Sequence, residues 1–173
     1  HRGCGLMLEE ADGESWGEVA QRIAALIEGE DDDIARMATI ACEIFHGFER
    51  FHWVGFYRVV APELMKIGPY QGGHGCLVIP FSRGVCGACA RARQTIIVPD
   101  VEAFPDHIAC SSTTRSELVA PVMRKGELVA VLDLQVGDLE LGARRARSVR
   151  GRIGKLPERA LGLLHLSRAL QGA

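Results

Sequence analysis

The sequence predicts an α+β fold in which an antiparallel sheet packs against helices. The hydrophobic period is helical over the first part of the chain and changes at His52 to the two-residue period of strands. The strands expected after that point are separated by short turns, which is how antiparallel strands are joined. Helices followed by a run of strands favour an α+β sandwich over a doubly wound parallel sheet.

Two helices are expected before the first strand. Ser15 to Glu18 has the form of a capping box, and apolar residues follow at helical spacing, so a helix is predicted over about 15–28. A second apolar stripe predicts a helix over about 34–45. The acidic run 31–33 lies where the dipole of that helix favours negative charge.

The remaining elements are predicted from alternation and turn residues. The segment 53–60 alternates as a strand, which places Trp53 and Tyr57 on the same face. The other expected elements are a hairpin partner at 64–67, a loop at 68–75, a short strand at 76–80, a short helix or turn at 84–93, a strand at 95–98, and a hairpin formed by 118–123 and 127–134.

Composition limits the classes of partner. The 173-residue chain fits one domain, and its formal net charge of -2 gives no general attraction to nucleic acid or anionic lipid. No apolar run reaches the roughly 18–20 residues that a membrane helix needs. We therefore expect a cytoplasmic protein that acts on a small molecule or a protein, with no nucleic-acid or membrane partner.

Three of the six cysteines lie in segments rich in Gly, Pro, His and Ser: Cys76, Cys86 and Cys110. Loops of this kind often carry catalytic groups, and several cysteines at one pocket indicate thiol–disulfide chemistry or a metal. A zinc site using Cys86-x-x-Cys89 with Cys76 and Cys110 is the weaker alternative, because structural zinc sites usually pair two such motifs.

The motifs around these cysteines closely resemble the free methionine-(R)-sulfoxide reductases of the GAF-domain class. The resemblance runs from about Trp16 to Leu134, and the cysteine intervals of 10 and 24 residues are those of that family. The matching segments are Gly68-Pro69-Tyr70-Gln71-Gly72, Ile79-Pro80-Phe81, Gly84-Val85-Cys86-Gly87, Val98-Pro99-Asp100-Val101, Phe104 to Cys110, Ser116-Glu117 and Val131-Leu132-Asp133.

This resemblance implies a GAF-like fold with a central antiparallel sheet of about six strands, usually dimeric. The GAF domain core is expected at 15–136, after an N-terminal extension at 1–14. An atypical basic segment and a C-terminal helix, 137–173, are expected to pack on the core.

The resemblance also implies a redox mechanism that needs no bound cofactor. Cys110 is the expected nucleophile, Cys76 the principal resolving cysteine and Cys86 the alternative. A thiolate that attacks the sulfoxide sulfur becomes a sulfenic acid, a second thiol forms a disulfide with it, and a dithiol such as thioredoxin reduces that disulfide. His107 and Arg115 are the nearby candidates for activating Cys110.

Recognition of a free amino acid calls for carboxylates that meet the substrate ammonium. The resemblance assigns this role to Glu117 and Asp133, with Glu117 also able to protonate the sulfoxide oxygen. Trp53 and Tyr57 match aromatic positions that enclose the methyl-sulfinyl end of the substrate.

Gln135 departs from the family pattern, which reads Leu-Asp-x-Asp-Ser where this chain reads Leu132-Asp133-Leu134-Gln135-Val136. If the usual Asp pairs with the ammonium, we expect weaker binding or slower turnover, and Gln135→Asp should increase kcat/KM. The alternative function is a GAF module that senses a small ligand without chemistry, because fold alone does not decide function.

Overall fold

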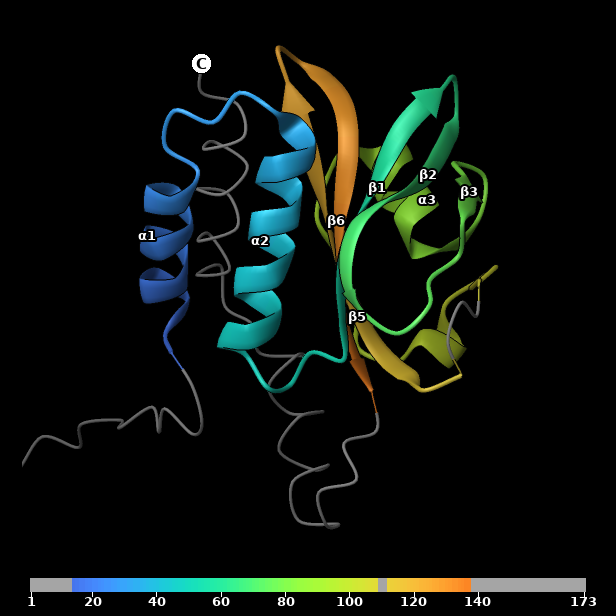
Figure 1. The fold of residues 1–173 in the computed structure, drawn as a ribbon. Coiled ribbons are helices and arrows are strands. Elements are labelled where there is room, and N and C mark those ends of the chain that lie inside the picture. The colour runs from blue at the N-terminus through green and yellow to red at the C-terminus, as the bar shows by residue number, and fades with distance from the viewer. Residues whose placement is uncertain (1–13, 109–111, 138–173) are drawn as a thin grey trace, which may run out of the picture.

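The computed structural model describes residues 14–108 and 112–137, and it confirms the α+β, GAF-like architecture (Figure 1). Six antiparallel strands form one sheet in the order β3-β2-β1-β6-β5-β4. The described elements are α1 (Trp16–Leu26), α2 (Asp33–Gly47), β1 (Trp53–Ala61), β2 (Leu64–Gly72), β3 (Val78–Pro80), α3 (Gly84–Ala92), β4 (Ile96–Val98), the 3-10 helix η1 (Val101–Ala103), β5 (Thr114–Arg124) and β6 (Glu127–Gly137).

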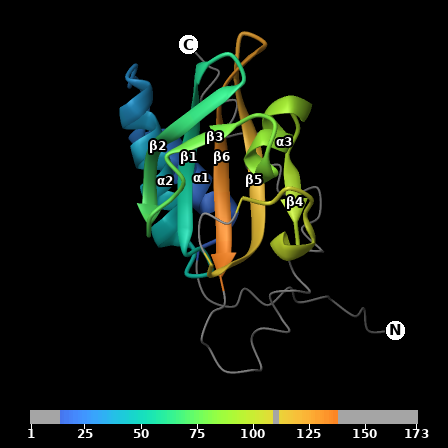
Figure 2. The ribbon, with the colours of Figure 1, turned by 90° about the vertical axis from the view of Figure 1, so that its right-hand side faces the viewer.

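The sheet separates two apolar cores. Helices α1 and α2 pack on one face, where Ile40 and Ile44 meet Val54 and Leu132. Helix α3 covers part of the opposite face (Figure 2), so the two faces of β1, β5 and β6 have different neighbours. Trp53 and Tyr57 lie on the α3 face, as the alternation of β1 predicts.

Both α1 and α2 begin with a side-chain cap, and the capping box predicted for the first helix is confirmed. The Ser15 amide donates to Glu18 Oε2 over 2.8 Å, and the Glu18 amide donates back to Ser15 Oγ over 3.3 Å. At α2, the Asp32 carboxylate accepts hydrogen bonds from the amides of Ile34 and Ala35. Each cap satisfies amide groups that have no partner within the helix.

The loop predicted at 68–75 is wrong over its first half, because β2 continues to Gly72. Gly55 pairs with Tyr70 whereas Tyr57 pairs with Ile67, so Gly68 and Pro69 together oppose one residue of β1. A β-bulge of this kind accommodates a proline, which cannot donate a ladder hydrogen bond. The short strand predicted at 76–80 correspondingly begins at residue 78.

The predicted hairpin of β5 and β6 is confirmed, and both strands are longer than expected. Lys125 and Gly126 have φ values of 50° and 84°, which is the backbone of a type I′ turn. The added residues at the far ends of the strands bring Thr114 beside Gly137. This lengthening matters for the site, because Thr114 and Gln135 both lie there.

None of the helices in the described ranges is long and apolar enough to cross a membrane. The predicted terminal segments, 1–14 and 137–173, lie almost entirely outside the described residues.

Candidate active site

A pocket of about 370 Å³ opens on the α3 face of the sheet. The lining residues come from β1, β3, β5, β6, α3 and the segments flanking them: Tyr57, Ile79, Gly84, Val85, Cys86, His107, Ile108, Thr114, Glu117, Asp133 and Gln135. The pocket therefore contains four of the predicted site residues on three strands, together with Cys86 on α3.

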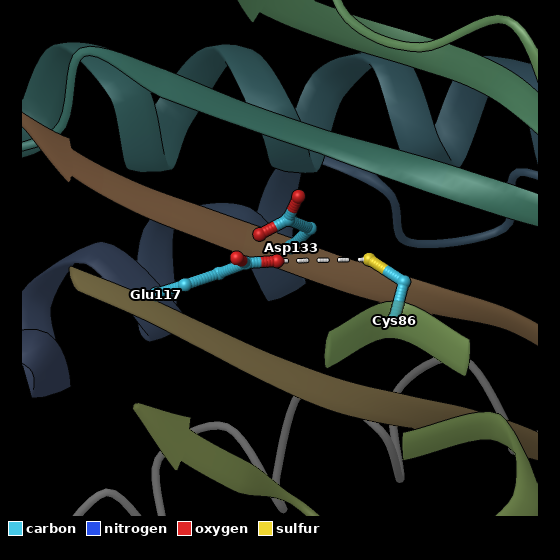
Figure 3. A group of neighbouring side chains, drawn as sticks. All are labelled: Cys86, Glu117 and Asp133. Atoms are coloured by element: carbon cyan, nitrogen blue, oxygen red, sulfur yellow. Dashed lines mark hydrogen bonds between the residues drawn. The ribbon is translucent and has the colours of Figure 1, made fainter. Parts of the chain in front are cut away.

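Two acidic side chains and a thiol among these lining residues point toward one another (Figure 3). Val119 of β5 pairs with Asp133 of β6, so Glu117 is a diagonal neighbour of Asp133 on the same face. Cys86 extends from α3 toward them, with its Sγ 3.8 Å from Glu117 Oε1. Ligand atoms of all three residues lie within 4.8 Å of one another.

Burial controls the ionisation of this cluster. Glu117 is 6% exposed and Asp133 is 1% exposed. Burial, followed by the charge of Asp133, raises the pKa of Glu117 well above its ordinary value. Burial raises the pKa of Asp133 to about 7, although a hydrogen bond from Gln135 opposes that increase. Near neutral pH, Glu117 is therefore the group that holds a proton, and Asp133 is the group that can be ionised.

The same burial keeps Cys86 protonated. Removal from water, then the charges of Asp133 and Glu117, raise the pKa of the Cys86 thiol well above its ordinary value. Cys86 is thus a poor nucleophile in this state of the site, since the thiolate is the reactive form.

The cluster is arranged to receive a cation. Asp133 Oδ1 is buried and has no hydrogen-bond partner among the described residues. An unsatisfied buried carboxylate oxygen is costly unless a donor or a positive charge meets it. An ammonium group would satisfy it, and the sulfur and oxygen ligands would also suit a metal ion. Cys89 is buried on α3 and is not part of this three-residue group.

Gln135 connects Asp133 to a second group of polar residues. Its amide Nε2 donates to Asp133 Oδ2 over 2.8 Å, while its Oε1 accepts from the Thr114 hydroxyl over 2.8 Å. Thr114 Oγ1 in turn lies 3.3 Å from Nε2 of His52. Sequence reasoning missed Thr114 and His52 as members of the site.

Strand alternation could not have found Thr114. Along most of β5 the odd-numbered residues, such as Glu117, face the pocket. Regular alternation would therefore point the even-numbered Thr114 toward α1 and α2. A register shift between Thr114 and Ser116 changes the facing at that end of the strand. Thr114 consequently joins the pocket lining.

The two predicted aromatic residues form one wall of the site region. Trp53 and Tyr57 are stacked, with ring centroids 5.8 Å apart, and Tyr70 stacks on the other side of Trp53 at 5.5 Å. Tyr57 lines the pocket itself, whereas Trp53 supports it and donates from Nε1 to the Gly73 carbonyl over 3.1 Å. Burial raises the pKa of the Tyr57 hydroxyl, which is therefore neutral.

The predicted nucleophile, Cys110, lies outside the described residues. Cys76 is half-buried beside the core on the α3 face and is disulfide-bonded. Cys42, Cys86 and Cys89 are free thiols.

The two residues predicted to activate Cys110 have different surroundings. His107 lines the pocket and is half-buried, and burial lowers its pKa, which favours the neutral imidazole. Arg115 donates to Glu102 and to the Ser112 carbonyl, and it is not among the lining residues.

Comparison with known proteins shows which proteins this chain resembles. Residues 30–151 match the model of the GAF domain family. "GAF domain-containing protein A" of Dictyostelium discoideum is 40% identical over 121 residues, which cover 70% of this chain and 76% of that protein. "Free methionine-R-sulfoxide reductase" of Saccharomyces cerevisiae is 35% identical over 122 residues, which cover 66% of this chain and 68% of that protein.

A solved structure extends the similarity to three dimensions. The free methionine-R-sulfoxide reductase of Neisseria meningitidis, in complex with its substrate, superposes with a TM-score of 0.74 at 34% identity. The match covers 90% of this chain and 86% of that one.

Proposed function

This chain belongs to the GAF domain family, in the class of the free methionine-R-sulfoxide reductases, and from that premise we propose that it reduces free methionine-(R)-sulfoxide to methionine. The observation that carries the proposal is the buried pair of Glu117 and Asp133 in the lining of the pocket. This pair suits a free amino acid, because an isolated ammonium is the substrate group that it can satisfy.

Selectivity for the free amino acid follows from the same pair. With Glu117 protonated and Asp133 ionised, the two carboxyl groups carry one negative charge, which one ammonium neutralises. Methionine sulfoxide within a peptide has an amide in place of the ammonium, so it would leave the buried charge of Asp133 unpaired. The aromatic wall of Tyr57 and Trp53 is the proposed surface for the methyl-sulfinyl end.

Cys110 is the proposed nucleophile. Its thiolate attacks the sulfoxide sulfur and forms an S–S bond, while the sulfoxide oxygen takes a proton from Glu117. The resulting hydroxyl then passes to the Cys110 sulfur as the substrate S–O bond and the new S–S bond both break, which releases methionine. The substrate sulfur gains two electrons, and the Cys110 sulfur loses two as it becomes a sulfenic acid. The neutral state of buried Glu117 supports its assignment as the proton donor.

Cys76 is the proposed resolving cysteine. Its thiol displaces water from the sulfenic acid and forms a disulfide, which a dithiol such as thioredoxin reduces by exchange. The observation that Cys76 is disulfide-bonded supports this role. Cys86 is the alternative resolving thiol, but burial beside two carboxyl groups makes it less readily ionised. No bound cofactor is needed in this scheme, and we propose that the enzyme acts as a homodimer.

The test is NADPH-coupled turnover through thioredoxin, using separated R and S epimers of free methionine sulfoxide. We expect turnover of the R epimer, little of the S epimer, and loss of turnover in Cys110→Ser. Cys42→Ser is the matched control, since Cys42 is a free thiol on α2, which packs on the opposite face of the sheet from the pocket. Equal turnover by Cys110→Ser and Cys42→Ser would contradict the proposed nucleophile.

A GAF module that only senses a ligand is the second candidate. It is retained because the Dictyostelium relative, at 40% identity, is named for its domain and not for an activity. A sensor would bind free methionine-(R)-sulfoxide in a titration and yet give no turnover with thioredoxin present. An enzyme would do both.

A further inference from the structure

We propose that Thr114 and Gln135 are positioning residues, which orient the Asp133 carboxylate as the receptor for the substrate ammonium. The inference deepens the proposed function and rests on it. It assigns roles to Thr114, which the sequence did not single out, and to Gln135, where the family pattern has an acidic residue.

The direction of every hydrogen bond in this chain of residues is fixed by chemistry. An amide nitrogen only donates, so the 2.8 Å contact between Gln135 Nε2 and Asp133 Oδ2 requires that oxygen to accept. The Gln135 oxygen is then an acceptor, and the 2.8 Å contact with Thr114 Oγ1 uses the hydroxyl proton. Thr114 thereby holds the amide in the orientation that donates to Asp133.

His52 completes the chain at its far end. Because the Thr114 hydroxyl proton is used, Thr114 Oγ1 accepts from His52, whose Nε2 lies 3.3 Å away and therefore carries hydrogen. The His52 amide donates to the Gln135 carbonyl over 3.1 Å, which fixes the backbone of both residues. The chain runs from His52 through Thr114 and Gln135 to Asp133.

Water has little opportunity to replace these contacts. Thr114, Gln135 and Asp133 are 4%, 7% and 1% exposed, respectively. Loss of one buried partner therefore leaves the other unsatisfied, which costs more than an exposed hydrogen bond contributes. The geometry thus makes Thr114 important for Asp133 even though another side chain lies between them.

The neutral amide of Gln135 also sets the charge of the pocket. The acidic side chains among the described lining residues are Glu117 and Asp133. With one proton on Glu117 the pair carries a single negative charge, equal and opposite to one ammonium. A carboxylate at position 135 would add a second negative charge beside Asp133 and would remove the donor that Asp133 accepts from.

Matched variants separate this role from a purely structural one. Thr114→Val removes the hydroxyl at nearly constant shape, whereas Thr114→Ser retains it. We expect Thr114→Val to raise KM for free methionine-(R)-sulfoxide by about tenfold with a much smaller change in kcat, because a donor to a charged group is misplaced. Thr114→Ser should remain within about twofold of the wild type.

The titration of Asp133 supplies a readout that does not need activity. The carbon-13 NMR shift of its carboxyl carbon, followed without substrate, should give a higher pKa in Thr114→Val than in the wild type or Thr114→Ser. Gln135→Met removes the amide that donates to Asp133. It replaces Thr114→Val in the titration if Thr114→Val does not fold. Gln135→Asp should lower kcat/KM, which is opposite to the gain that the family resemblance alone predicts.

Two results would overturn the inference. The first is that Thr114→Val has the same Asp133 pKa and the same KM as the wild type. The second is that Gln135→Asp has a higher kcat/KM than the wild type. Failure of the proposed function looks different, since the wild type would then give no turnover. In that case the titration of Asp133 in the three Thr114 forms still decides whether the chain of hydrogen bonds controls its ionisation.

Discussion

Replacing Asp133 with Asn should stabilise the fold while removing the function. Asp133 is 1% exposed, and burial raises its pKa from 3.8 to about 7. Because the folded-state pKa lies above the unfolded value, the stability contributed by this group is fully present below pH 4 and is lost as the pH rises through about 7. A pKa raised from 3.8 to about 7 corresponds to a loss of unfolding free energy of up to about 4 kcal/mol at pH 8.

Asn avoids this loss without removing the hydrogen bond to Gln135. Its oxygen can accept from Gln135 Nε2, and its amide nitrogen can occupy the place of Asp133 Oδ1, which has no partner among the described residues. The pKa of Glu117 is also raised by the Asp133 charge, so the substitution relieves both groups. The gain should therefore grow from about pH 4 to about pH 7, because over that range Asp133 ionises in the unfolded chain but stays protonated in the folded one, and it should level off above about pH 7.

Urea denaturation at several pH values measures this effect. The unfolding free energy of Asp133→Asn should exceed that of the wild type by about 1–2 kcal/mol at pH 5 and by up to about 4 kcal/mol at pH 8. Glu127→Gln is the control, because the side chain of Glu127 is 80% exposed and should change stability little at either pH. Parallel pH dependences for Asp133→Asn and the wild type would refute the claim that Asp133 is a buried, strained charge.

Two further predictions concern ligand affinity and the packing behind the pocket. In Cys110→Ser, which cannot turn over, the affinity for free methionine-(R)-sulfoxide should rise with pH and level off above about 7, because Asp133 ionises over that range. Titration calorimetry from pH 5.5 to 8.5 measures this dependence. A Kd that does not change with pH would count against it. Gly55→Ala should destabilise the fold by about 1–3 kcal/mol in urea, since its Cβ would lie 2.4 Å from Tyr70 Cβ and 2.5 Å from the Trp53 ring. Gly73→Ala is the control, because a Cβ there meets nothing within 4 Å and should leave the unfolding free energy nearly unchanged. Equal unfolding free energies for Gly55→Ala and Gly73→Ala would show that Trp53 and Tyr70 shift at little cost.

Periodicity predicted much of what positions the site. The alternation along β1 placed Trp53 and Tyr57 on one face, and the hairpin turn at Lys125-Gly126 followed from its residue types. These features depend on local sequence alone. The motif resemblance then singled out Glu117 and Asp133, which the register of β5 and β6 brings together.

The features missed by sequence reasoning depend on irregular pairing between strands. The bulge at Gly68 and Pro69 extends β2 through a segment rich in turn residues. The register shift after Thr114 turns that residue into the pocket, against the alternation of the rest of the strand. Bulges arise from how two strands fit each other, so a single strand's pattern does not contain them.

The most direct test of the central claim compares free methionine-(R)-sulfoxide with its N-acetyl derivative in the thioredoxin-coupled assay. The derivative keeps the sulfoxide but lacks the ammonium that the Glu117–Asp133 pair is proposed to bind. We predict that kcat/KM for the free amino acid exceeds that for the derivative by at least about 100-fold, because the derivative leaves a buried charge unpaired. Equal kcat/KM values for the two compounds would contradict the claim that this pair makes the protein an enzyme for the free amino acid.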